Sequence, residues 1–531
     1  MRSFLKISTI IFLFVSCSKP NPRVITKTIK LDTASGKPVL SKIIDYGSYK
    51  LPVSGKIKEF KGDNKAFIGE ILVLRGKNFG RQPTIMVADK PTPVLLRLAD
   101  GGIVIRVPRQ IPSGEQKVVV STNNGITSKN IKIIRVAAAQ APGSSKTLLF
   151  NSLNWTTIKE FKFGKVLNAV FHTEKPFLYI TTEAKGKFQL ITIDTAAQPG
   201  PKVIDKKKIK LNKLLSFGIS QNSEVLFAVA DTGVVIYNLE SASYPRAHTF
   251  QKFVNLKDKG NILDAAVSPD SKTLALLLSE DNLVKFYDVQ VPDNIKEGQQ
   301  LNVLPEAKVP LLRKLYFTSS QTDQNLWVLT GDTDESLKVG YHSSDMVKYE
   351  LKSAPDRTGE IKVKKIQSYP MFIQKISPNG IDSATKGADE SEDASLNKWT
   401  KYYYISLIHS ELLTISRLPL TTPSGLQKGI ETISTIKFNG VLHRLDYRGR
   451  TKSFYKSKDV IGSFKLSSDG KTALMAVCKP QVNKEKMTVD FDCGIRIHNL
   501  ESGKAKSIKQ GKIMKKDFVS PFNFGMTSIQ D

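Results

Sequence analysis

The stretch Ala265-Ala-Val-Ser-Pro-Asp-Ser-Lys-Thr-Leu-Ala-Leu-Leu-Leu278 places two short apolar runs on either side of the polar segment Ser268-Pro-Asp-Ser271. Proline fixes φ, and short polar side chains bond to nearby backbone, so this segment is typical of a tight turn. Two apolar runs of this length around a turn predict a pair of antiparallel strands. The stretch therefore predicts a β-hairpin.

The same pattern returns along most of the chain. A strand that ends in Ser, His or Thr is followed by a polar turn and a second apolar strand, at first about every 48 residues. Asn-Leu-Glu-Ser also closes both 234–241 and 494–502. Self-similarity at such a period indicates an array of small structural units. The strands that carry the repeat are Ala169–His172, Phe217–Ser220, Ala265–Ser268, Leu315–Thr318, Gln374–Ser377 and Phe464–Ser467.

A repeat of this length with about four strands resembles the WD40-like and lactonase-like β-propellers, which implies a ring of blades over residues 147–531. The Gly-His and Trp-Asp pairs of true WD40 repeats are absent, so a divergent relative is implied. A seventh repeat at Phe518–Ser520 has few residues after it, and strands at Thr147–Asn151 and Thr156–Phe163 would complete its blade. We therefore predict an all-β chain with a seven-bladed propeller closed by strands from both ends of the repeat region. Six blades are the alternative.

Residues 51–137 form a separate pattern of short alternating strands bounded by Gly, Asn and Pro. They contain a Gly-x-Asn-Phe-Gly turn at 76–80, the pair Val107-Pro108 and a Thr-x-x-Gly hairpin at 122–125. These motifs resemble the IPT/TIG family of immunoglobulin-like domains, which implies an antiparallel sandwich with a spacer or interaction role. The small residues of 138–146 predict a linker between this domain and the propeller.

Residues 1–16 have a positive start, a short apolar run and a small residue before Cys17. The segment resembles the signal peptide of bacterial, spirochaete-like lipoproteins, in which the cysteine is lipidated after cleavage. The resemblance implies a palmitate-type anchor on Cys17, a location at the outer membrane or elsewhere in the envelope, and a tether over residues 17–50. An ordinary secretory signal with an unmodified cysteine is the alternative.

Export would leave Cys478 and Cys493 as an even pair in an oxidising compartment. They stand at the ends of two predicted strands, and cross-strand neighbours could meet disulfide geometry. We expect a disulfide between them, with two free buried cysteines as the alternative.

The chain is strongly basic, with 79 Lys and Arg against 49 Asp and Glu and a net charge of +30. Such a surface attracts anions, among them lipid headgroups, acidic glycans and nucleic acid. Export disfavours nucleic acid, and a role in solubility alone is the alternative. The segment 380–400 is locally acidic and lacks strand character, which predicts a disordered insertion.

The sequence offers little sign of catalysis. None of the six histidines stands at metal-ligand spacing from another His or Cys, and no nucleophile elbow or phosphate-binding loop is present. His172 and His498 fall at repeat positions, which favours structural roles. We predict no catalytic residues, no metal and no cofactor. Trp399, Tyr402 and Tyr404 stand near basic residues and could form an exposed face for a glycan or peptide.

These features predict a lipid-anchored, non-enzymatic binding protein of the cell envelope. It would present a basic propeller surface to an envelope or extracellular protein or to an acidic glycan. One alternative is a lactonase-like hydrolase exported to the periplasm, which would need carboxylates and histidines that converge on one face. A second alternative is a scaffold for outer-membrane assembly.

Overall fold

The computed structural model describes residues 36–45, 64–109, 111–172 and 174–209. From residue 214 onward it describes the strands given below, together with residues 214, 239, 467, 500, 502–504 and 530. This described part of the chain consists of strands and turns and contains no helix. The protein is therefore all-β over the described residues, as predicted.

Two sheets that face each other make up the region from residue 39 to residue 134. Every pairing is antiparallel except that of β2 with β9. The first sheet has the order β1 (Val39–Asp45), β3 (Ile71–Lys77), β7 (Ile103–Arg106) and β6 (Leu96–Arg97). The second has the order β2 (Lys65–Phe67), β9 (Gly125–Ile134), β8 (Gly114–Thr122), β4 (Thr84–Val87) and β5 (Lys90–Pro91).

One aliphatic core lies between these two sheets, and we call the whole region the sandwich. Alternate residues of each strand point into the core, as the period of a strand requires. Leu72 and Leu74 of β3 meet Val118 and Val120 of β8 there, and all four are fully buried. Phe79, from the predicted turn at 76–80, closes one end of the core.

The prediction of a tether over residues 17–50 is wrong for residues 39–45. Val39–Asp45 is a strand that pairs with β3 along its whole length. Leu40 and Ile43 enter the core of the sandwich, and Ile44 is buried on the opposite face of the sheet. The polar, Pro- and Gly-punctuated surroundings concealed a strand that is apolar enough to be buried.

Residues from 136 onward form seven four-stranded sheets within the described part of the chain. Six of them follow chain order from the first strand to the fourth, with every pairing antiparallel. The first three are β13 (Lys165–Phe171) to β16 (Lys202–Ile209), β17 (Ser216–Ile219) to β20 (His248–Asn255), and β21 (Ile262–Val267) to β24 (Lys296–Asn302). The next three are β25 (Leu312–Ser319) to β28 (Lys362–Tyr369), β29 (Phe372–Asn379) to β32 (Thr451–Ser457), and β33 (Val460–Leu466) to β36 (Ala505–Ile513).

The strands between these bounds complete each sheet. They are β14 (Phe177–Ala184), β15 (Lys187–Asp194), β18 (Val225–Val229), β19 (Gly233–Asn238), β22 (Thr273–Leu278) and β23 (Leu283–Asp288). The others are β26 (Asp323–Thr330), β27 (Ser344–Lys352), β30 (Tyr402–Ile408), β31 (Gly440–Asp446), β34 (Thr472–Asn483) and β35 (Thr488–Asn499). The hairpin predicted at 265–278 is the pair β21–β22.

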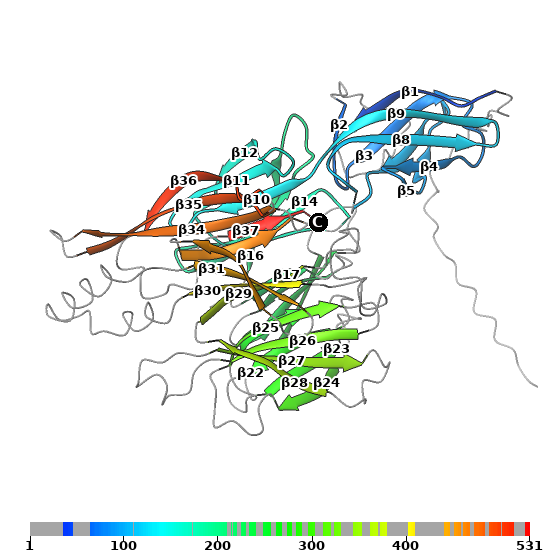
Figure 1. The fold of residues 1–531 in the computed structure, drawn as a ribbon. Helices are drawn as coiled ribbons and strands as arrows, with labels where there is room; N and C mark the ends of the chain where they lie inside the picture. The colour runs from blue at the N-terminus through cyan, green and yellow to red at the C-terminus, as the bar shows by residue number, and fades with distance from the viewer. Residues whose placement is uncertain are drawn as a thin grey trace, which may run out of the picture.

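Neighbouring sheets touch through their first strands. β13 contacts β17, β17 contacts β21, β21 contacts β25, and β29 contacts β33. Figure 1 shows these sheets as one body, with the sandwich at its upper right. Small four-stranded sheets that pack face to face give the region a propeller-like architecture, and we call it the ring.

The seventh sheet joins the two ends of the ring. Its order is β12 (Thr157–Lys162), β11 (Lys146–Asn151), β10 (Val136–Gln140) and β37 (Met526–Ile529). β37 pairs with β10 and also contacts β13 and β33, the first strands of both neighbouring sheets. The expected strands at 147–151 and 156–163 therefore lie in this sheet. The expected repeat at Phe518–Ser520 lies outside the described residues.

The predicted linker over 138–146 is wrong for its two ends, because residues 138–140 belong to β10 and residue 146 begins β11, with a tight turn between them. All five residues of β10 are buried. Ala137 and Ala139 face the sheet β33–β36, where they meet Leu474 and Ile495, whereas Ala138 faces the sheet β13–β16. A sheet covered on both faces leaves little room, so small side chains here indicate close packing rather than flexibility.

The sandwich and the ring meet in a tightly built junction. Gly69 has φ of +80°, and a Cβ there would lie 2.5 Å from the carbonyl oxygen of Glu174 in the ring. The buried side chain of Gln530 donates from Nε2 to the carbonyl oxygen of Ile68 (3.4 Å) and accepts from the amide of Val136 (3.3 Å). Backbone packing and buried amide bonds therefore fix one domain against the other.

Candidate functional site

The structure places the predicted site residues in different parts of the chain. Cys17, Trp399 and the insertion 380–400 lie outside the described residues. Tyr402 and Tyr404 belong to β30, where their backbones pair with Asn379 and Ser377 of β29. The predicted aromatic face for a glycan or peptide stays a prediction.

Cys478 and Cys493 are joined by a disulfide in the structure. They lie directly opposite each other on β34 and β35, with Cα atoms 4.1 Å apart, and both are buried. Strand pairing continues past them to Asn483 and Thr488, so the bridge sits within a long hairpin rather than at its base. The sequence predicted the pairing but placed the ends of the two strands at the cysteines.

The side chain of His172 stabilises a turn by accepting hydrogen bonds from backbone amides. Its Nδ1 accepts the backbone amides of Glu174 (3.0 Å) and Lys175 (3.2 Å). Burial, followed by the positive charges of Lys175 and Arg106, lowers the pKa of His172 to about 3. The imidazole is therefore neutral at physiological pH, and its role is to cap the loop that meets Gly69 at the junction.

No group of three or more His, Cys, Asp and Glu side chains in the described residues could hold a metal ion. The same residues contain no helix that is long and apolar enough to cross a membrane.

Exposed lysines gather on the outermost strands of three neighbouring sheets. β12 carries two lysines and one glutamate, β16 carries four lysines and one aspartate, and β36 carries three lysines and no acidic residue. We call the exposed members the lysine belt. They are Lys159, Lys162, Lys202, Lys206, Lys208, Lys506 and Lys509.

The three strands of the lysine belt pack against cores that neighbouring sheets share. Ile158 and Phe161 of β12 and Val203 of β16 pack against the same core. Ile508 of β36 packs against the cluster that holds Leu148 of the neighbouring sheet. Figure 1 shows β12 and β36 in the upper part of the ring, with β11 labelled between them. Apolar residues thus turn inward while the alternate lysines face solvent.

Few acidic groups neutralise the lysine belt. Glu160 forms an ion pair with Lys146 (3.1 Å), outside the belt itself, and Asp492 pairs with Lys509 (3.0 Å). Asp205 lies 3.9 Å from Lys207. Ion pairs at exposed positions contribute little to stability, so most of the positive charge stays available to an external anion.

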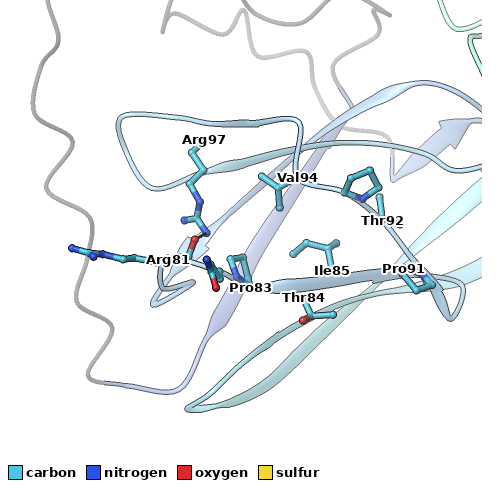
Figure 2. Close-up of a pocket in the computed structure, with 10 residues that line it drawn as sticks. Arg81, Pro83, Thr84, Ile85, Pro91, Thr92, Val94 and Arg97 are labelled. Carbon is cyan, nitrogen blue, oxygen red and sulfur yellow. Dashed lines mark hydrogen bonds between the residues drawn. The ribbon is translucent and has the colours of Figure 1, made fainter.

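A second candidate site is a hollow in the sandwich, of about 540 Å³, which Figure 2 shows. Its apolar side chains are Pro83, Ile85, Pro91, Pro93 and Val94. Two arginines, Arg81 and Arg97, stand at its edge. Sequence reasoning missed this site, although three prolines within eleven residues, at 83, 91 and 93, were a visible signal.

The sequence matches no protein-family model and no curated protein. Among solved structures, the chain is similar to a candidate 6-phosphogluconolactonase from Bacteroides fragilis, with 10% identity, a TM-score of 0.41, and coverage of 75% of this chain and 98% of that one. A candidate 6-phosphogluconolactonase from Bacteroides uniformis shares 12% identity at a TM-score of 0.41, over 72% and 96% of the two chains. The tricorn protease shares 10% identity at a TM-score of 0.37, over 90% of this chain and 49% of that one.

At these identities and TM-scores the likenesses carry nothing about substrate or reaction, and the fold is described from the arrangement of the sheets themselves. The described chain is thus an all-β protein in which a ring of four-stranded sheets resembles a propeller.

Proposed function

We propose that this chain is a non-enzymatic binding protein of the cell envelope whose lysine belt engages a polyanionic partner, either an acidic protein surface or an acidic glycan. In this proposal the seven sheets are the seven blades of one closed propeller. The sandwich is of the immunoglobulin-like class and lies between the propeller and a lipid anchor on Cys17.

The observation that carries the proposal is the surplus of lysine on β12, β16 and β36. Charges within about 10 Å of one another act together at moderate salt, because the screening length is of that order. The lysine ammonium is a mobile point charge, whereas the arginine guanidinium is a rigid planar fork. The belt therefore suits a partner with dispersed negative charge better than one discrete ligand. Affinity of this kind falls steeply as salt rises.

The two other predictions, a lactonase-like hydrolase and an outer-membrane assembly scaffold, stay predictions. A hydrolytic site would need carboxylates and histidines that converge on one face. In the described residues, His172, one of two buried histidines, accepts backbone amides, and Asp194, one of three buried acidic side chains, accepts the amide of Ala196 (3.0 Å). Both side chains hold turns. Turnover of a simple lactone by the purified chain would contradict the non-enzymatic proposal.

The decisive experiment compares two variants with the same change in charge. The belt variant replaces Lys159, Lys206, Lys208 and Lys506 by Gln, and the control replaces the exposed sandwich residues Lys37, Lys65, Lys77 and Lys117 by Gln. Retention on a heparin column and on immobilised poly-glutamate is measured at increasing salt. We expect the belt variant to elute at clearly lower salt than the control.

Equal elution of the two variants would show that net charge alone governs retention and would contradict the belt. Retention on heparin but not on poly-glutamate would favour a glycan partner, and the reverse would favour a protein. Thermal unfolding of both variants checks that neither substitution set disturbs the fold.

The lipid anchor needs its own test, because what supports it is the sequence around Cys17. Metabolic labelling with palmitate should mark the wild-type chain and not Cys17→Ala, and only the wild type should partition with membranes. A label that survives Cys17→Ala would refute the anchor without touching the lysine belt.

A further inference from the structure

The hollow in the sandwich lies between the edges of its two sheets. β4 and β5 supply one side, β6 supplies the other, and the segment 92–95 connects them. Thr92 donates its amide to the carbonyl oxygen of Ile85 (2.9 Å), which fixes the floor. A volume of about 540 Å³ falls within the range of small-molecule sites, roughly 300–1,000 Å³.

The apolar wall of the hollow is rigid and lacks hydrogen-bond donors along much of its length. Pro83, Pro91 and Pro93 have no backbone N–H, and each fixes its own φ. Ile85 is buried at the base, and Val94 projects beside it (Figure 2). A wall that is ordered before binding loses little entropy when a ligand arrives.

Among the described residues that line the hollow, Arg97 provides the positive group that faces this wall. Its Nη2 donates to the carbonyl oxygen of Arg81 (2.8 Å), which holds the guanidinium at the edge of the hollow. In Figure 2 the side chain of Arg97 points toward the hollow, whereas that of Arg81 extends away from it. Among the described residues, no carboxylate lies within ion-pair distance of Arg97. Burial lowers the pKa of Arg97, as expected of a cation with reduced hydration.

These features select one kind of ligand. A guanidinium has five donors in a planar fork that matches a carboxylate, and most remain for a ligand after the bond to Arg81. A peptide backbone on the apolar wall would leave its carbonyl groups without donors, which costs free energy, whereas an alkyl chain has no such need. The chain's own N-terminal segment is also unsuitable, because residues 18–35 carry Lys19, Arg23, Lys27 and Lys30 and would be repelled by Arg97.

We propose that this hollow binds an alkyl carboxylate, with the carboxylate on Arg97 and the alkyl chain along Pro83, Pro93 and Val94. The site is independent of the lysine belt: it is a discrete cavity with one directional cation, and its ligand is a small monoanion.

The test uses the full chain and octanoate as the probe, with octanamide as the neutral isostere, and measures both affinities by titration calorimetry. We expect octanoate to bind and octanamide to bind at least about tenfold more weakly, since hydrogen bonds to charged groups contribute roughly 1.5–3 kcal/mol. Arg97→Gln should lose a similar factor, and Arg97→Lys should recover only part of it because lysine lacks the fork. Lys117→Gln, at an exposed sandwich residue outside the hollow, is the matched control and should bind octanoate as the wild type does.

Equal affinity for octanoate and octanamide, or an unchanged affinity in Arg97→Gln, would overturn the proposal. Tighter binding of acetyl-Leu-Val than of octanoate would also overturn it, in favour of a peptide C-terminus. The four-lysine belt variant should keep its affinity for octanoate. The proposal for the hollow and the proposal for the lysine belt are therefore tested independently. Thermal unfolding of Arg97→Gln confirms that any loss of binding is not a loss of fold.

Discussion

β9 and β10 follow each other with a single residue, Arg135, between them, yet their side chains differ in burial. β9 (Gly125–Ile134) belongs to the sandwich and keeps most of its first half exposed. β10 (Val136–Gln140) belongs to the ring and is buried on both faces. A sandwich strand has one covered face and one face toward water, whereas a strand between two packed sheets has none toward water. The change of domain therefore happens at Arg135 and needs no flexible linker.

Hydrogen bonds of Arg135 fix the sandwich and the ring against each other at this point. Its side chain is buried and donates from Nη2 to the carbonyl oxygen of Ile111 in the sandwich (2.9 Å). Its own carbonyl oxygen accepts the amide of Ser152 in the ring (2.9 Å). One residue thus bonds to both domains.

The largest expected effect comes from placing a charge on each of these two strands. Ala138→Asp would bury a carboxylate between two apolar sheets and should destabilise the ring by about 4 kcal/mol or more. Ser128→Asp puts the same side chain on the exposed face of β9 and should change stability by no more than about 0.5 kcal/mol. Chemical denaturation followed by tryptophan fluorescence measures both. Similar effects at the two positions would break the distinction between the strands.

A glycine substitution tests whether the two domains are fixed against each other. Gly69→Ala introduces a Cβ against the backbone of Glu174 and Lys175 at a positive φ, and we expect a loss of about 2–4 kcal/mol. Gly186→Ala has a similar φ of +70° but meets nothing within 4 Å, so it should cost only about 1–2 kcal/mol. Thermal unfolding gives the comparison. If the two variants lose equal stability, the contact at Gly69 does not hold the junction.

The smallest expected effect is a dependence of stability on pH within the ring. Burial raises the pKa of Asp194 to about 6, above its value of about 4 in an unfolded chain. The folded state therefore prefers the protonated carboxyl, and this contribution is complete below pH 4 and is lost as pH rises through 6. Asp194→Asn keeps an acceptor for the amide of Ala196 and should remove a dependence of about 2 kcal/mol between these values.

Unfolding free energies of wild type and Asp194→Asn at pH 4, 5, 6 and 7 measure this contribution as their difference. Asp205→Asn, on the adjacent strand β16, controls for the loss of one carboxylate. Parallel curves for wild type and Asp194→Asn would contradict the expectation.

Local pattern predicted much of the strand content of this protein. Short strands such as β4 (Thr84–Val87) lie in the region 51–137 where the sequence predicts them, and the Thr-x-x-Gly signal at 122–125 is the turn between β8 and β9. These succeed because alternation and turn chemistry are encoded within a few neighbouring residues. β10 was missed because its five residues include three alanines, and small residues in sequence look the same in a linker and in a crowded interface.

The candidate sites were harder to predict, for a different reason. Lys206 and Lys208 stand out in the sequence, but Lys159 and Lys506 join them only because distant sheets pack together. Arg97 faces the apolar wall of the hollow only because β6 lies at the edge of one sheet and β4 near the edge of the other. A surface assembled from separate strands depends on topology, which short-range pattern does not contain.

The sheet that joins both ends of the ring can be completed only late in the synthesis of the chain. β10, β11 and β12 are synthesised early, but the strand that completes their sheet, β37, is synthesised only after the strands of the six other sheets. Until then β10 exposes an unpaired edge and an apolar face that a chaperone could recognise. A chain that lacks residues 526–529, or is cleaved before them by a protease, cannot shield that edge. The ring can therefore close only after synthesis has passed residue 529.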